Sequence, residues 1–103
     1  MTIEQAQKDF NKLIAENGFT IAGYTSDTNI PIYQKVWTKK VQVAWYGEQD
    51  SMLEIRIRLS FGYPLVSVKR NGKLERNLIR DYSSPKRAMN AIREIVRCAG
   101  FDW

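Results

Sequence analysis

The sequence predicts an α+β domain: an N-terminal helix, an antiparallel meander of four to five strands and a C-terminal helix, with both helices on one face of the sheet. Both ends of the chain carry apolar residues at helical spacing, and the middle alternates apolar with polar residues. Asn71-Gly72 adds a typical hairpin turn. The 103 residues fit a single domain spanning 1–103, since domains commonly hold about 100–150 residues.

The first expected element is an amphipathic helix over residues 2–17. Gly18 suits the left-handed conformation that ends many helices. Residues 19–25 then predict a strand, and turn-forming residues fill 26–31. The helical positions expected to face the core are Ile3, Ala6, Phe10, Leu13 and Ile14.

Residues 32–46 are β-branched and aromatic and predict one long strand. Lys39-Lys40 is a poor two-residue turn, so an irregularity there is favoured over a break into two strands. A bulge at that point would bring Val36 onto the same face as Val41. The following turn is expected at 47–51.

Residues 52–61 give the clearest strand pattern. Glu54, Arg56 and Arg58 alternate with apolar side chains, so the strand has one polar and one apolar face. The apolar positions, which are expected to face the core, are Leu53, Ile55, Ile57, Leu59 and Phe61.

Two further strands, 65–70 and 73–82, are expected to pair across Asn71-Gly72. A two-residue turn would set Val66 and Val68 beside polar residues. A three-residue loop sets Val68 beside Leu74 instead, and this register is favoured.

The final helix is expected to begin at Ser84, as N-cap, with Pro85 in its first position. Gly100 is expected to end it, and residues 101–103 to anchor the C-terminus against the domain. Its apolar stripe is Ala88, Ala91, Ile92, Ile95 and Ala99.

The composition argues against several classes of protein. Histidine, the commonest general base, is absent, and Cys98 is the only cysteine, so neither a disulfide framework nor a metal site is expected. No Gly-rich phosphate loop is present, and no apolar run approaches the ~18 residues of a membrane span. We therefore expect a cytoplasmic protein that is not an enzyme and needs no cofactor.

The charge is uneven along the chain. Residues 1–31 hold two cations and four anions, a net of −2, whereas residues 32–103 hold fourteen cations and seven anions, a net of +7. A positive excess confined to one part of a small domain is typical of nucleic-acid-binding proteins.

If both helices cover the face that holds Leu53 and Ile55, the opposite face of the sheet is bare. Alternation would place aromatic and basic side chains together there, as base stacking and phosphate contacts of a single strand require. The alternatives to nucleic acid are that a protein partner or a second copy of the chain covers this face, or that its aromatic residues are buried within the domain. The residues expected on this face are Tyr33, Lys35, Trp37, Tyr46, Arg56, Arg58, Ser67 and Lys69.

The start of the final helix is a second candidate site, because Ser84, Lys86, Arg87 and free backbone N–H groups would suit a phosphate. Residues 83–96 resemble the last helix of double-stranded RNA-binding domains, in which a Ser-Lys-Lys-type helix start holds phosphates. That resemblance implies phosphate contacts at this helix start, although the chain has more strand than that family. The strand-strand-helix end is similar in outline to AP2-type and integrase-type DNA-binding domains.

The predicted function is non-covalent nucleic-acid binding, with single strands or RNA favoured, through the sheet face and the helix start. The alternative is a protein-interaction module. It would be a small regulator or inhibitor that docks on an acidic or nucleic-acid-handling partner, or a homodimer formed through the sheet face.

Overall fold

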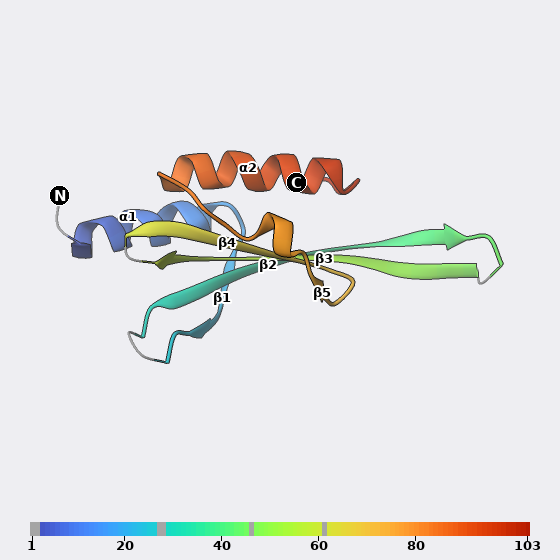
Figure 1. The fold of residues 1–103 in the computed structure, drawn as a ribbon, viewed down its shortest axis with the longest axis horizontal. Helices are drawn as coiled ribbons and strands as arrows, with labels where there is room; N and C mark the ends of the chain where they lie inside the picture. Colours follow the sequence, from blue (N-terminus) through green and yellow to red (C-terminus); the bar gives the residue numbers. More distant parts are fainter. Residues whose placement is uncertain (1–2, 27–28, 46, 61) are drawn as a thin grey trace.

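The computed structural model describes residues 3–26, 29–45, 47–60 and 62–103. Its α+β fold has a helix near each end of the chain and an antiparallel sheet between them in the sequence, as predicted (Figure 1). Tyr46, Phe61 and the side chain of Ile3, three of the positions predicted above, lie outside what it describes. The elements are α1 (Ile3–Glu16), β1 (Thr20–Tyr24), β2 (Pro31–Val43), β3 (Gly47–Ser60), β4 (Tyr63–Arg70), β5 (Lys73–Leu74), the 3-10 helix η1 (Arg76–Leu78), β6 (Arg80–Asp81) and α2 (Pro85–Cys98).

The strands form one sheet in the order β1-β2-β3-β4-β5, and β6 also pairs with β4. Figure 1 shows α1 and α2 on the same side of this sheet, as expected from the sequence. We call this side the helix face and the other side the open face. Neither of these helices is long and apolar enough to cross a membrane.

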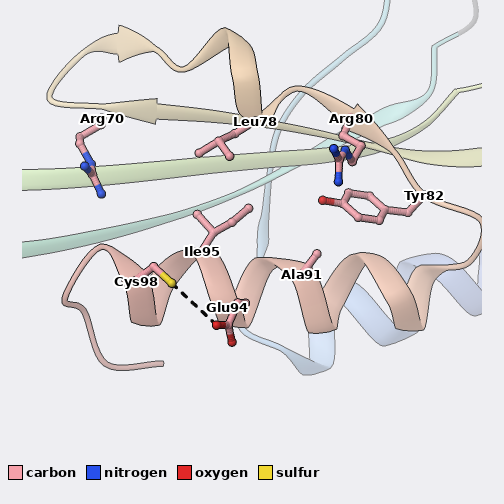
Figure 2. Close-up of a pocket in the computed structure, with 8 residues that line it drawn as sticks. All are labelled: Arg70, Leu78, Arg80, Tyr82, Ala91, Glu94, Ile95 and Cys98. Atoms are coloured by element: carbon pink, nitrogen blue, oxygen red, sulfur yellow. Dashed lines mark hydrogen bonds between the residues drawn. The ribbon is translucent and has the colours of Figure 1, made fainter.

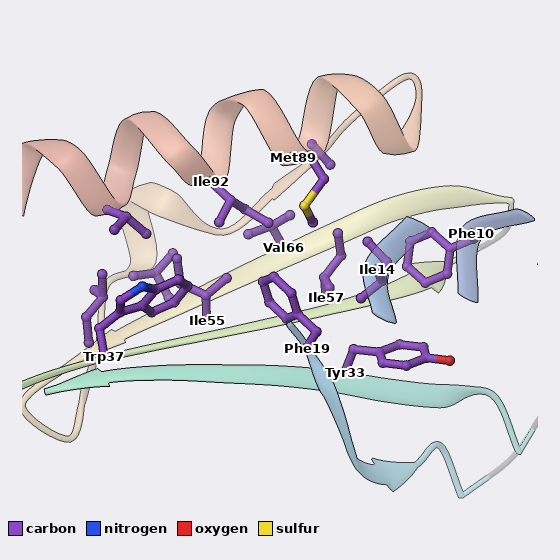
Figure 3. Packing of buried hydrophobic residues seen from close by; sticks show 14 of the residues in the cluster. Phe10, Ile14, Phe19, Tyr33, Trp37, Ile55, Ile57, Val66, Met89 and Ile92 are labelled. Carbon is purple, nitrogen blue, oxygen red and sulfur yellow. The ribbon is translucent and has the colours of Figure 1, made fainter. Parts of the chain in front are cut away.

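The core fills the space between the helices and the helix face (Figure 3). From α1 it takes Phe10 and Ile14, as predicted. The buried side of α2 is turned slightly from the predicted stripe, because Met89 and Val96 are buried whereas Ala91 and Ile95 are only partly so. The sheet contributes Tyr33, Trp37, Leu53, Ile55, Ile57, Leu59, Val66 and Val68.

The long strands β2 and β3 pair without interruption from Tyr33 and Ile57 to Val43 and Gly47. The bulge predicted at Lys39-Lys40 is therefore absent. The turn also comes earlier than predicted, since Ala44 and Trp45 are in a turn and β3 begins at Gly47. Lys39 lies on the helix face, where its Nζ donates a hydrogen bond of 2.8 Å to the Gly100 carbonyl.

The far end of the β2–β3 hairpin extends beyond the rest of the sheet (Figure 1). Pairing of β3 with β4 stops at Leu53, and pairing of β2 with β1 stops at Gln34. We call residues 40–45 and 47–50 the arm; its strand residues 40–43 and 47–50 therefore pair only with each other. All arm residues whose burial is described are exposed, and the molecule is 55 Å long but only 26 Å and 23 Å across.

The turn between β4 and β5 is a two-residue turn, so the three-residue loop predicted from the sequence is wrong. Lys69 pairs with Leu74 and Arg70 with Lys73 across Asn71-Gly72. Both turn residues have positive φ, +52° and +83°, the signature of a type I′ hairpin turn. The polar residues after Leu74 need no partner in the core, because η1 interrupts the strand that was expected to run to residue 82.

Replacing Gly72 with alanine is expected to lower the free energy of unfolding by about 1–2 kcal/mol, the cost of a left-handed backbone for a residue with a Cβ. No atom would lie within 4 Å of that Cβ, so the backbone alone sets the cost. Gly23 is the matched control, since its Cβ position is equally open and its φ is not positive. Urea unfolding of both variants measures the effect. An equal loss in Gly23→Ala would contradict the turn assignment.

The C-terminal residues anchor the chain against the domain, as predicted. Phe101 is buried, and the Trp103 ring lies 5.6 Å from the Trp37 ring and 6.4 Å from the Phe19 ring, centroid to centroid. This anchor occupies the helix face beside β2. Its Trp103 contacts Trp37 and Lys35, two residues that were predicted for the opposite face of the sheet.

Candidate nucleic-acid interface

The aromatic residues predicted for the open face of β2 lie on the helix face instead. Tyr33 and Trp37 are buried, at 6% and 7% exposure, whereas Val36 between them is 41% exposed. Burial of an aromatic ring removes about 150–250 Å² of surface from water, more than a valine offers, so the aromatic set faces the core. The predicted stacking surface of these two rings is therefore wrong.

Lys35 shares the helix face and lies over the C-terminal anchor. Its Nζ is 4.2 Å from the Trp103 ring centroid and 5.1 Å from that of Trp37. It also donates a hydrogen bond of 3.0 Å to the Asn17 carbonyl. Burial, and secondarily the charge of Arg93, lowers the pKa of the Lys35 ammonium. These contacts give Lys35 a structural role, in place of the nucleic-acid contact predicted for it.

Tyr33 makes the stability of the domain sensitive to alkaline pH. Burial, and secondarily Tyr24, raises the pKa of its hydroxyl above 10.0. Because the folded state holds this proton more tightly than the unfolded chain, the stabilisation is complete below pH 10 and is lost as the pH rises further. Lys35 contributes a pH dependence of the opposite sign. Because its pKa is lowered in the folded state, its contribution to stability rises with pH until the pH reaches the pKa that this lysine has in the unfolded chain.

We expect Tyr33→Phe to lose less stability than the wild type above pH 10. Both proteins contain Lys35, so the difference between their unfolding free energies isolates the tyrosine. Urea unfolding at several pH values between 8 and 11 provides the measurement. Parallel curves for the two proteins would contradict the raised pKa.

The other basic residues predicted for the open face, Arg56, Arg58 and Lys69, lie there, but part of their charge is already used. Arg56 donates from Nε to Gln34 at 3.0 Å and lies 3.6 Å from a Glu54 carboxylate oxygen. Arg58, Ser67 and Lys69 occupy open-face register positions on β3 and β4. This face therefore keeps these cations but loses the two rings, Tyr33 and Trp37, that were predicted to stack on bases.

A denser group of cations lies along the edge of the sheet beyond β4. From residue 70 to residue 87 the chain holds six basic and two acidic residues, a net of +4. All six cations are exposed, and none has an ion pair or a side-chain hydrogen bond within the described part of the chain. We call this group the basic edge: Arg70, Lys73, Arg76, Arg80, Lys86 and Arg87.

Strand register brings several of these cations to one side. Arg80 pairs with Val66, a core residue, so Arg80 lies on the helix face, as does Arg70, which is four residues further along β4 than Val66. Asp81, the neighbouring acid, pairs with Leu65 and therefore lies on the open face. The anion is thus separated from the cations by the sheet itself.

A pocket of about 370 Å³ opens between α2 and this edge. In Figure 2 the guanidinium groups of Arg70 and Arg80 extend from the strands toward α2, and the Tyr82 ring lies beside Arg80. Ala91 and Ile95, which are only partly buried, line the helix side, and Leu78 of η1 lies opposite. The pocket therefore combines two cations, an aromatic ring and apolar walls.

One carboxylate, Glu94, lines the pocket, and its charge is offset. It accepts a hydrogen bond from Arg97, which lowers the pKa of the Glu94 carboxyl, and its Oε1 lies 3.7 Å from Cys98 Sγ. Cys98 is exposed at the pocket wall and gives a site for chemical probes. The described residues contain no cluster of three histidine, cysteine or acidic side chains that fits a metal ion.

The helix start predicted as a phosphate site is capped by its own serine. Ser84 Oγ accepts a hydrogen bond of 3.2 Å from the Arg87 backbone N–H, and Pro85 occupies the first turn. One of the free N–H groups is therefore satisfied within the chain. Lys86 and Arg87 stay exposed at this end of α2 and extend the basic edge.

Sequence reasoning missed Arg70, Arg80 and Tyr82. Residues 73–82 were expected to form one strand, which would have spread these side chains along a regular edge. The available signal was the density of cations between residues 70 and 87.

The chain was compared with protein-family models, curated proteins and solved structures, and none of the three comparisons gave a match.

Proposed function

We propose that this protein binds single-stranded nucleic acid through the basic edge and the pocket beside α2, without a chemical step. The observation that carries the proposal is the group of six exposed, unpaired cations of the basic edge, two of which, Arg70 and Arg80, line a pocket with an aromatic wall. Unpaired cations attract a phosphate backbone, because its condensed counterions are released on binding. The predicted binding surface is thereby moved from the open face to the edge of the sheet.

The pocket favours a single strand over a duplex. A base can leave the stack and enter a hollow that offers Tyr82 and apolar walls, whereas the bases of a duplex are stacked inside it. The volume of about 370 Å³ lies within the range of sites for small organic groups, ~300–1,000 Å³.

Polarisation binding to labelled single-stranded and duplex oligonucleotides tests the proposal. We expect tighter binding of the single strand, and slower alkylation of Cys98 by a maleimide when the strand is bound, because Cys98 lines the pocket. No binding tighter than ~100 μM at low salt would contradict nucleic-acid binding, since even non-specific binders exceed that affinity. Tighter duplex binding, or full reactivity of Cys98 in the complex, would contradict the assigned site.

A protein-interaction role is the second candidate, and the open face favours it. This face has no covering helix, and it exposes apolar side chains at Val36, Met52, Tyr63 and Leu74. Uncovered apolar groups on a sheet typically mark an interface. The partner could be a second copy of this chain or a separate protein of acidic surface.

A further inference from the structure

The arm is the part of the molecule whose stability the fold itself does not explain. A lone two-stranded hairpin is marginally stable in water, and the arm has neither a third strand nor a helix against it. Its tip carries Trp45, which is 93% exposed. Tryptophan is a common anchor of protein interfaces and is costly to leave in water. A surface outside this copy of the chain would therefore stabilise the arm.

The charge of the arm argues against nucleic acid as that surface. Its open-face side chains include Glu48 and Asp50 on β3 and Lys40 on β2, and Lys40 Nζ already lies 4.0 Å from Glu48. A phosphate backbone would meet two carboxylates and one paired cation there, which is unfavourable. A surface with exposed arginines fits the arm better.

The open face of β3 supplies that surface. The side chains on this face are acidic at the start of the strand and basic at its end. Their order along β3 is Glu48, Asp50, Met52, Glu54, Arg56, Arg58. The two ends of one strand thus carry opposite charge. A second copy of the same strand, laid antiparallel across the first and centred on Leu53, would set Asp50 on Arg56 and Glu48 on Arg58.

We infer that the protein forms a homodimer in which each arm lies on the open face of the other copy. The twofold axis lies in the plane between the two sheets, perpendicular to β3. Rotation about it reverses the strand direction and faces the two open sides to each other, so both acid–arginine contacts occur twice. The face-to-face stacking also covers Val36 and Met52, and it carries the arm tip with Trp45 to the level of the β3–β4 turn, beside Tyr63 of the second copy.

This dimer specifies the partner left open for the protein-interaction role, and it is independent of nucleic-acid binding. The basic edge and its pocket lie at the far side of β4, next to α2 and away from the stacked faces. Two copies would therefore present two basic edges. The dimer would also cover Arg56 and Arg58, which makes them unavailable to a nucleic acid.

Charge reversal tests the arrangement directly. Glu48→Arg/Asp50→Arg reverses the arm, and Arg56→Glu/Arg58→Glu reverses its docking surface. Each double variant alone is expected to run as a monomer of 12.0 kDa in sedimentation equilibrium, whereas the wild type runs at twice that mass. An equimolar mixture of the two variants is expected to run at the dimer mass again, because one arm contact is restored with both charges exchanged and the other is native.

Two controls keep the test decisive. A chain carrying all four substitutions is expected to dimerise with itself. Lys8→Glu/Lys12→Glu changes the net charge as Arg56→Glu/Arg58→Glu does, but on the exposed side of α1, and it is expected to leave the dimer intact. Circular dichroism confirms that each variant is folded. A wild type that stays monomeric at millimolar concentration would overturn the inference, and so would a dimer that survives both reversals or a mixture that stays monomeric. Oligonucleotide binding by the monomeric variants is expected to persist, so failure of the dimer is distinct from failure of the nucleic-acid site.

Discussion

Replacing Trp37 with alanine is expected to lower the free energy of unfolding by about 3–5 kcal/mol, the usual cost of removing a buried aromatic side chain. Trp37 is 7% exposed and packs edge-on against Phe19 at 6.3 Å between centroids. Its loss would also leave Trp103 and Lys35 without their shared neighbour. The effect should fall toward the low end of this range, because the Trp37 Nε1 donor is buried without a partner, and removing such a group regains part of its desolvation cost.

This is a large fraction of the total stability, which is about 5–15 kcal/mol for a typical domain. Equilibrium unfolding in urea measures it. Val36→Ala is the matched control on the same strand, since Val36 points to the open face and is 41% exposed; a surface substitution of this kind usually changes stability by about 0.5 kcal/mol or less. A Trp37→Ala protein as stable as the wild type, but defective in nucleic-acid binding, would contradict the burial of this residue and favour the sheet face as the binding site.

Replacing Arg70 and Arg80 together with alanine is expected to weaken single-strand binding about 25-fold at 0.1 M salt. The estimate follows from counterion release, which makes the affinity scale with salt to the power of about −0.7 for each phosphate contact of a single strand. Each lost contact then costs about fivefold at 0.1 M relative to 1 M salt. Both residues are exposed and lie outside the core, so the variant should keep its fold.

The matched control removes two cations elsewhere. Lys8→Ala/Lys12→Ala makes the same change in net charge on the exposed side of α1 and is expected to leave the affinity nearly unchanged. An equal loss in both variants would mean that net charge, and no particular surface, sets the affinity.

The sequence patterns that involve local chemistry predicted the fold well. Ser84 and Pro85 begin α2 as expected, the alternating stretch predicted as a strand from residue 52 lies in β3, which begins earlier at Gly47, and Phe10 and Ile14 face the core from α1. Each of these features depends on a helix cap, a period or a turn that a short stretch of sequence contains.

The side of the sheet on which β2 places its aromatic residues could not be predicted in this way. The positions between Tyr33 and Trp37 include apolar Val36 as well as polar Gln34. The alternation therefore does not decide which face of the strand points to the core. The choice depends on Phe19 and Trp103, which come from distant parts of the chain and complete the cluster around Trp37. Lys35 lies on the buried side only because the same cluster and the Asn17 carbonyl receive its ammonium group.

The pocket beside α2 depends on two further tertiary details. The helix is turned so that Met89 and Val96 are buried, which leaves Ala91 and Ile95 partly exposed toward the sheet edge. The chain after Leu74 forms η1 and only then rejoins β4 as β6. Neither the rotation of a helix by part of a turn nor the interruption of a short edge strand follows from hydrophobic periodicity.

The salt dependence of single-strand binding is the sharpest test of whether nucleic acid binds at the basic edge. It should be measured on the wild type, on Arg70→Ala/Arg80→Ala and on Arg56→Ala/Arg58→Ala. With about five phosphate contacts the wild type is expected to show a log–log slope near −3.5, and loss of two contacts should bring it to about −2.1. We expect this smaller slope in Arg70→Ala/Arg80→Ala and the wild-type slope in Arg56→Ala/Arg58→Ala. A slope unchanged in Arg70→Ala/Arg80→Ala but reduced in Arg56→Ala/Arg58→Ala would contradict it and place the nucleic acid on the open face.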